Sequence, residues 1–234
     1  PDRQDRDRRA DLARRRARQG EARLSAYQEY LRFIVTLTAV LDPFLAIPIF
    51  LSVTAAGEAG ARQRLANTVT LTVLAVLASA AIFGEALLKV LGASLPAFQV
   101  GGGLVLLLMS LAMLNAQVGG MRQSRAEEEE LESGALTGVV PLAVPLLAGP
   151  GAISTTIIAA QAGGVAHTSV LLACIGLVAA LLWLVLRLAD AVGQKMGRTG
   201  LNIVTRLLGL LLAAIAVETM ADGLKVLFPG LTSA

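Results

Sequence analysis

Two apolar stretches of the chain each contain a pair of prolines separated by four residues. The pairs are Pro43 with Pro48 and Pro145 with Pro150. Proline has no N–H to bond the carbonyl four residues back, so each proline leaves one backbone carbonyl without its helical partner. Such a carbonyl is costly in an apolar environment unless protein or a cavity satisfies it. The prolines therefore predict that backbone groups at these breaks bind a ligand. Released carbonyls suit a cation, and the first N–H groups of a helix that restarts suit an anion.

The side chains around these breaks are small or carry hydroxyl groups, which leaves room for a compact ligand. A ligand with both charges, such as a small zwitterion, would use both kinds of backbone group. A single kink is ordinarily packing in a membrane helix, but two at matching places favour a binding site. The residues predicted to bind a ligand are Asp42, Pro43, Ala46, Pro48, Pro145, Ala148, Gly149, Pro150, Gly151, Ser154 and Thr155.

Ionisable side chains inside apolar stretches are the second group of candidates, because an ionisable residue at membrane depth is expensive and by default marks function. Asp42 precedes Pro43 and has two compatible roles: binding a cation or proton, and capping the helix that restarts. Glu218 is a second candidate for ion coupling, and Asp222 follows it on the same helix face. Arg206 would pair with a carboxylate or a lipid head group. A coupling proton or sodium ion is the only cofactor expected, and no metal site is predicted.

The elements that hold these residues are membrane helices. Of the 234 residues, 55% are hydrophobic and only 16% are charged, which is too little charge to cover a soluble domain of this length. A spanning helix needs about 20 apolar residues. Six blocks meet this requirement, and the sequence therefore predicts an all-α integral membrane protein. The blocks are residues 29–54, 66–90, 96–117, 137–161, 168–189 and 203–227.

The two halves of the chain resemble each other. The proline pairs align with an offset of 102 residues, and Gln99 and Asn115 in the third block align with Arg206 and Asp222 in the sixth with an offset of 107. An odd number of spans in each copy makes the copies enter the membrane from opposite sides, as in many secondary transporters. The prediction is two inverted three-helix repeats, each with a broken first helix. The repeats are residues 29–117 and 137–230, joined by a charged linker over 118–136.

Charge is concentrated at the start of the sequence. Residues 1–32 hold ten of the twenty basic residues, and residues 1–28 form a polar, Arg-rich tail without the apolar core of a signal peptide. No aromatic residues alternate with this charge, so no nucleic-acid partner is expected. Basic residues in loops one, three and five place the termini outside the cell, whereas the tail places the N-terminus inside. His167 is expected in a loop, and without any catalytic motif no enzyme is expected.

Three segments carry a resemblance to a known family. They are L-D-P-F-L-A-I-P-I-F-L (41–51), P-L-A-V-P-L-L-A-G-P-G-A-I-S-T (141–155) and R-L-L-G-L-L-L-A-A-I-A-V (206–217). They resemble the MarC family of bacterial inner-membrane proteins, also classed as neutral amino acid transporters. The resemblance implies six helices in two inverted repeats, and small neutral amino acids such as glycine and alanine as substrates. The residues that it supports are Asp42, Pro43, Pro48, Pro145, Gly149, Pro150, Gly151, Ser154, Thr155 and Arg206.

The chain departs from the usual family pattern at three places. Leu45 and Ala46 stand where Gly-Asn is usual, Gln99 stands where Arg is frequent, and Glu218 stands where Gln is frequent. The resemblance predicts a multi-pass protein of the bacterial inner membrane that transports small neutral amino acids and is coupled to an ion. The alternatives are a non-transport role linked to the envelope or to stress, and export of another small solute.

Overall fold

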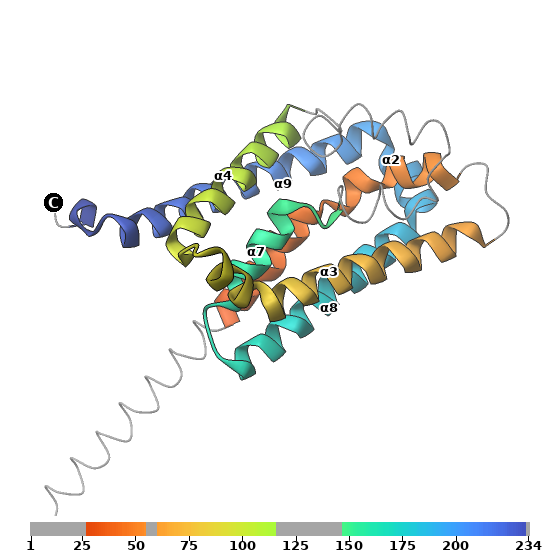
Figure 1. The fold of residues 1–234 in the computed structure, drawn as a ribbon. Helices are drawn as coiled ribbons and strands as arrows, with labels where there is room; N and C mark the ends of the chain where they lie inside the picture. Colours follow the sequence, from red (N-terminus) through yellow and green to blue (C-terminus); the bar gives the residue numbers. More distant parts are fainter. Residues whose placement is uncertain (1–26, 55–59, 116–146, 233–234) are drawn as a thin grey trace, which may run out of the picture.

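The computed structural model describes residues 27–54, 60–115 and 147–232, and every regular element in these ranges is a helix. A first helix covers residues 27–41 and is followed by the other elements in chain order (Figure 1). These are α2 (Pro43–Thr54), α3 (Ala61–Leu91), α4 (Leu95–Leu114), α7 (Pro150–Ala160), α8 (Val165–Arg187), α9 (Ala189–Leu227) and the 3-10 turn η2 (Pro229–Thr232).

Five helical segments are long and apolar enough to cross a membrane: Tyr27–Leu51, Arg62–Leu91, Leu95–Leu114, Val165–Arg187 and Thr199–Leu227. They correspond to the first, second, third, fifth and sixth predicted blocks. The fourth block is represented by the shorter α7, because residues 137–146 lie outside the described part of the chain. The prediction of an all-helical, multi-pass membrane protein is confirmed. The C-terminal span follows a kink in α9 at Gly197, whose φ of 63° is a backbone conformation that suits glycine.

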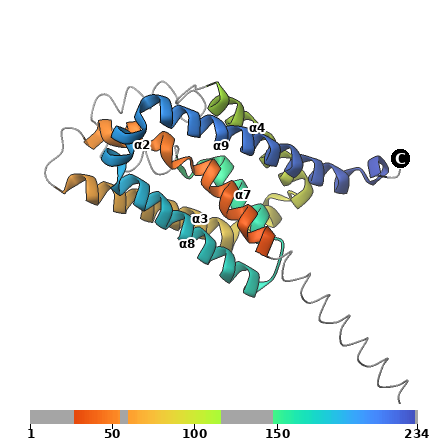
Figure 2. The same cartoon turned by 180° about the vertical axis from the view of Figure 1, so that it is seen from behind.

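Helices α4 and α9 pack against each other along their length and in opposite directions (Figures 1 and 2). The start of α4 meets the end of α9, where Gly223 lies against the carbonyl of Pro96. In the middle Gly103 lies against Ala216, and further on Gly209 lies against Met113. Because glycine has no side chain, the two backbones can approach closely at these positions. Membrane helices associate through such close packing in the absence of a hydrophobic driving force.

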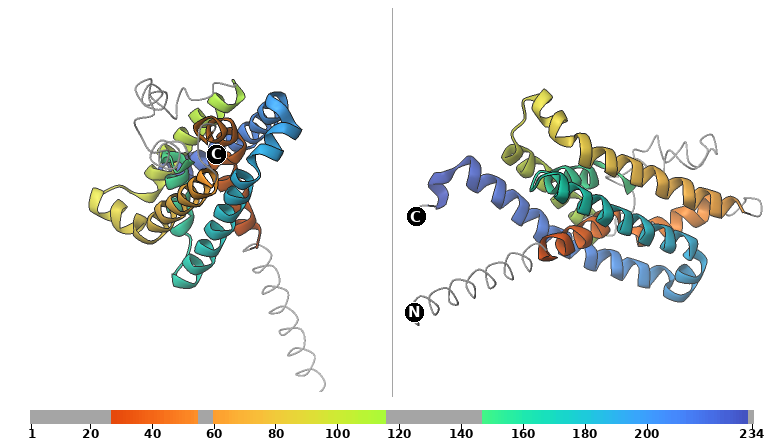
Figure 3. Two further views of the ribbon diagram at one scale, coloured as in Figure 1. Left: turned by 90° about the vertical axis from the view of Figure 1, so that its right-hand side faces the viewer. Right: turned by 90° about the horizontal axis from the view of Figure 1, so that it is seen from below.

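Helices α3 and α8 form a second antiparallel pair. Asn67 near the start of α3 accepts a hydrogen bond from the indole Nε1 of Trp183 near the end of α8, at 2.7 Å. An ion pair between Arg62 and Asp190 lies at the same end of the molecule. Helix 27–41 and α7 lie between this pair and the α4–α9 pair, so the molecule has three layers (Figures 1 and 3). The middle layer carries the break at Asp42 and the start of α7.

Candidate functional site

The first helix breaks at Asp42. The helix over 27–41 ends there, Asp42 has a φ of 41°, and α2 begins at Pro43. The Asp42 Oδ1 atom accepts a hydrogen bond from the backbone N–H of Leu45 at 3.2 Å. Asp42 is thus the N-cap of α2, and Pro43 occupies the first helical position, where its missing N–H costs nothing. The residue is 0% exposed, so this cap lies inside the protein.

The second break has the same design without a side-chain cap. Gly149 is the N-cap of α7 and Pro150 is its first residue. The Gly149 carbonyl accepts hydrogen bonds from Ala152 and Ile153 at 3.0 and 3.1 Å. Pro43 and Pro150 thus both begin a helix, and their offset, 150 − 43 = 107, equals the offset between the aligned residues of the third and sixth blocks. The proline spacing had paired Pro43 with Pro145, which lies outside the described residues.

The small residues around the breaks are packed rather than facing open space. Ala46, Ala148 and Gly149 are buried. A side chain at Gly151 would collide with the sulfur of Met109, so this glycine seats α7 against α4. Pro48, inside α2, and Pro150 are exposed.

The predicted hydroxyl groups bond within their own helix. The Ser154 and Thr155 side chains both donate to the Gly151 carbonyl, at 3.1 and 2.8 Å. This satisfies both hydroxyl hydrogens locally, and each oxygen can still accept a further bond.

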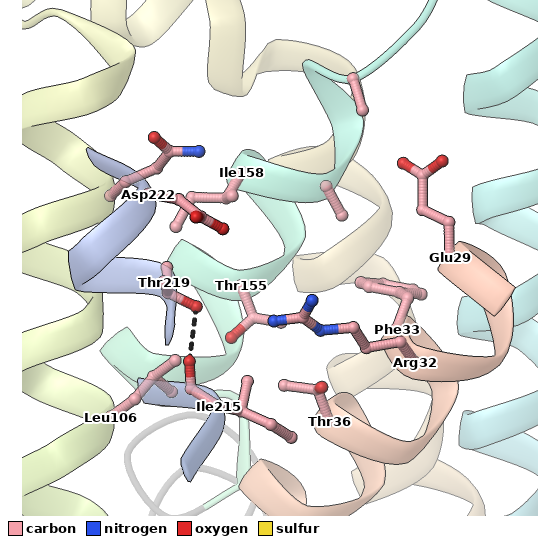
Figure 4. A pocket seen from close by; sticks show the side chains of 13 residues that line it. Glu29, Arg32, Phe33, Thr36, Leu106, Thr155, Ile158, Ile215, Thr219 and Asp222 are labelled. Carbon is pink, nitrogen blue, oxygen red and sulfur yellow. Dashed lines mark hydrogen bonds between the residues drawn. The ribbon is translucent and has the colours of Figure 1, made fainter. Parts of the chain in front are cut away.

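A cavity of about 280 Å³ lies between helix 27–41, α4, α7 and α9 (Figure 4). Of the predicted binding residues that the structure describes, only Thr155 lines it. The rest of its lining combines both charges with neutral polar groups and an apolar surface. The charged residues are Glu29, Arg32 and Asp222, the polar residues are Thr36, Gln99, Thr155 and Thr219, and the apolar residues are Phe33, Leu106, Ile158, Ala159, Ala162 and Ile215.

The exposed lining residues of the cavity lie at one end of the bundle, and none of the described residues 42–48 and 147–151 lines it. Glu29, Ala162 and Asp222 at its mouth are exposed, whereas Thr36 and Thr155 deeper down are buried. Thr36 lies six residues before Asp42, which is about 9 Å along a helix. Asp42 thus lies beyond the last lining residue of helix 27–41, on the side away from the mouth.

An ion pair joins two layers of the molecule beside the mouth. Arg32 Nη1 donates to Glu218 Oε1 at 3.0 Å, and Arg32 Nη2 lies 2.6 Å from Glu218 Oε2. Sequence reasoning missed Arg32 because it counted this residue with the Arg-rich tail. The available signal was its position inside the first apolar block, directly before Phe33.

The two predicted ion-coupling residues lie at different depths. Glu218 is at the level of Arg32, whereas Asp42 follows Arg32 by ten residues, about 15 Å along the axis. Arg206 is exposed on α9, twelve residues before Glu218, and does not line the cavity.

His167 connects three helices near the mouth of the cavity. It lies in the first turn of α8, not in the expected loop, and is half-buried. Its Nε2 atom lies 2.9 Å from the Ala159 carbonyl and must donate to it, so Nδ1 of the neutral ring accepts from the Tyr30 hydroxyl, also at 2.9 Å. Helix 27–41, α7 and α8 are joined by this one side chain.

Replacing Tyr30 with phenylalanine is expected to destabilise the protein by about 1 kcal/mol, because the bond to Nδ1 is lost while the ring contact stays. The thermal midpoint in detergent should fall. Tyr27 is 72% exposed at the start of the same helix, so Tyr27→Phe is the matched control and should leave the midpoint unchanged. Equal midpoints for the two variants would show that the Tyr30–His167 hydrogen bond does not stabilise the protein.

Comparison with known proteins identifies relatives over nearly the whole described chain. The family model "MarC family integral membrane protein" matches residues 27–228. The chain is 34% identical over 203 residues to the UPF0056 membrane protein YhcE of Escherichia coli (strain K12), covering 86% of this chain and 94% of YhcE. It is 33% identical over 201 residues to the UPF0056 membrane protein YvbG of Bacillus subtilis (strain 168), covering 85% and 95%. No solved structure matches the chain.

Proposed function

Because the chain belongs to the MarC family of integral membrane proteins, we propose that it is a secondary transporter of small neutral amino acids. Glycine and alanine are the substrates proposed, the bacterial inner membrane is the location, and a proton or sodium gradient drives the flux. The observation that carries the proposal is the cavity among helix 27–41, α4, α7 and α9, whose lining combines charged, polar and apolar residues. Charged groups at its mouth and buried threonines further in suit the binding of a small polar solute.

The cavity matches a small zwitterion in size and in charge. Its volume of about 280 Å³ is just below the range of about 300–1,000 Å³ found for drug-sized ligands. Arg32 supplies a cation and Glu29 and Asp222 supply anions, while Leu106, Ile158 and other apolar side chains complete the wall. A small amino acid presents a carboxylate, an ammonium group and a short apolar side chain, so each part has a complementary surface.

Two inverted repeats of three helices, residues 29–117 and 137–230, would give this cavity its transport cycle. Three features support the repeats: the offset of 107 shared by the helix starts and the third helices, the antiparallel α4–α9 pair, and the antiparallel α3–α8 pair. Rocking of one repeat against the other would close the present mouth and open a path from the opposite end. Asp42, buried at the first break, is the residue proposed to bind the coupling ion, with Glu218 as the second candidate.

Uptake of labelled glycine and alanine into liposomes containing the purified protein tests the proposal. The expected result is saturable uptake that an imposed proton or sodium gradient accelerates. Flux equal to that of protein-free liposomes under either gradient, with correct insertion verified by protease accessibility, would contradict it. That outcome would favour a non-transport role or another solute.

Replacing Ala162 with tryptophan should block this uptake, because Ala162 lines the mouth of the cavity and a large ring there obstructs entry. Ala166 is exposed four residues later and does not line the cavity. Ala166→Trp therefore adds the same ring at the same end of the protein and should transport at the wild-type rate. Equal uptake by both variants would place the route of the substrate elsewhere.

A further inference from the structure

We propose that Arg32 binds the carboxylate of the transported amino acid and that Glu218 is the exchangeable partner of Arg32 in the ligand-free protein. Entry of the substrate replaces one carboxylate on the guanidinium by another. This assignment rests on the proposed function and adds to it the residue that recognises the substrate and the contact that recognition breaks.

The contact between Arg32 and Glu218 already has the geometry of substrate recognition. Two guanidinium nitrogens face two carboxylate oxygens, at 3.0 and 2.6 Å. This bidentate arrangement is specific for a planar carboxylate and independent of the molecule that carries it. Glu218 therefore stands in for the carboxylate of an amino acid, in the same way that an internal ligand occupies a site until a free ligand arrives.

The guanidinium group is also placed where a ligand would meet it. Figure 4 shows the Arg32 side chain extending across the cavity from helix 27–41 towards Thr155 of α7, with Thr36 below it. Arginine carries five N–H donors, and the contact with Glu218 occupies only part of them. A carboxylate that enters from the mouth reaches the guanidinium before it reaches the buried threonines.

Exposure makes the internal pair easy to replace. The side chains of Arg32 and Glu218 are 46% and 56% exposed, so the protein does not enclose the pair and an incoming carboxylate can reach the guanidinium group. A bound amino acid would make contacts that Glu218 does not make. Its ammonium group would lie near the Asp222 or Glu29 carboxylate, and its side chain would lie on Leu106 and Ile158. These additional contacts favour the substrate over Glu218 as the partner of Arg32.

The exchange would also release a connection between the two halves of the chain. Arg32 belongs to the first helix of the first half and Glu218 to the last helix of the second half, 186 residues away. Loss of their contact on substrate binding removes one connection between α9 and helix 27–41 at the mouth, so that the two halves can move more freely relative to each other.

Opposite effects of two neutralising substitutions test the exchange. The measurement is equilibrium binding of labelled glycine to the purified full-length protein in detergent. Arg32→Gln should weaken binding by about 10- to 100-fold, because a charged hydrogen-bonding partner of the carboxylate is lost. Glu218→Gln should tighten binding by about two- to five-fold, because the competing carboxylate is removed. Glycinamide, which lacks the carboxylate, should fail to compete with labelled glycine in the wild type.

A pair with only a structural role predicts a different pattern, in which both substitutions shift affinity in the same direction and glycinamide competes as well as glycine. Either result would overturn the assignment. If Arg32→Gln does not yield a monodisperse protein, the double variant Arg32→Gln with Glu218→Gln, which leaves no unpaired charge, replaces it and should bind as weakly. Wild-type protein that neither binds nor transports glycine and alanine would reject the proposed function, and the assignment with it. Binding unaffected by Arg32→Gln would reject the assignment alone.

Discussion

Asp42→Ala is expected to destabilise the protein by about 2 kcal/mol, whereas Asp42→Asn is expected to preserve stability and abolish ion-driven uptake. Alanine loses the N-cap bond to Leu45 and must adopt a φ of 41°, which disfavours residues other than glycine, asparagine and aspartate. Asparagine keeps an oxygen that accepts the Leu45 N–H and tolerates this backbone conformation. The pair of variants thus separates the structural role of Asp42 from the role of its charge.

Thermal midpoints in detergent and uptake in liposomes provide the two readouts. The structural role requires a lowered midpoint for Asp42→Ala alone. The coupling role requires that Asp42→Asn, folded and correctly inserted, no longer responds to a gradient. Gradient-driven uptake by Asp42→Asn at the wild-type rate would restrict Asp42 to its capping role and leave Glu218 as the candidate for coupling.

Gly103→Ala is expected to destabilise the contact between α4 and α9 by about 1–3 kcal/mol, the range seen for overpacking. A Cβ atom at Gly103 would lie 2.9 Å from the Ala216 carbonyl oxygen, which belongs to the backbone and cannot rotate away. Two residues earlier on the same helix, a Cβ atom at Gly101 meets nothing within 4 Å. Gly101→Ala should therefore be neutral or stabilise the helix by up to about 1 kcal/mol, because alanine is the better helix former.

The comparison of these two glycines measures how much the α4–α9 contact matters for the whole bundle. The expected order of thermal midpoints is Gly101→Ala at or above the wild type, and Gly103→Ala below both. Because α4 and α9 both line the cavity, Gly103→Ala should also lower uptake. A midpoint of Gly103→Ala equal to that of Gly101→Ala would show that close packing of α4 against α9 does not contribute to the stability of the protein.

The break at Asp42 and the start of a helix at Pro150 could both be located from the sequence. Proline removes a backbone donor wherever it stands, so Pro43 and Pro150 marked interrupted helices, and Asp42 was a good N-cap by residue type. Pro48 and Pro150, which the proline spacing aligns, take different positions in the structure: Pro48 lies inside α2, whereas Pro150 begins α7. Which proline begins a helix depends on how its neighbours pack, and this information is not contained in the spacing.

The cavity, in contrast, could not be located from the sequence. Its lining comes from four helices that are distant in the sequence, and of the described residues predicted to bind a ligand only Thr155 takes part. Small residues such as Gly151 suggested open space, but in the structure they let α7 approach α4 closely. A small side chain is equally compatible with a cavity and with close packing, and only the position of the neighbouring helix distinguishes the two.

The sequence by itself determined that this protein spans a membrane, where its apolar helices lie and where the first of them breaks. Hydropathy is a property of one continuous segment of about 20 residues, and missing proline donors and capping act within one turn of a helix. The tertiary structure alone decided that Arg32 faces Glu218, that Tyr30 meets His167, and that a cavity lies between helix 27–41, α4, α7 and α9. Those outcomes depend on how helices far apart in the chain pack together. Partners 186 and 137 residues away from each other leave no local pattern from which they could be predicted.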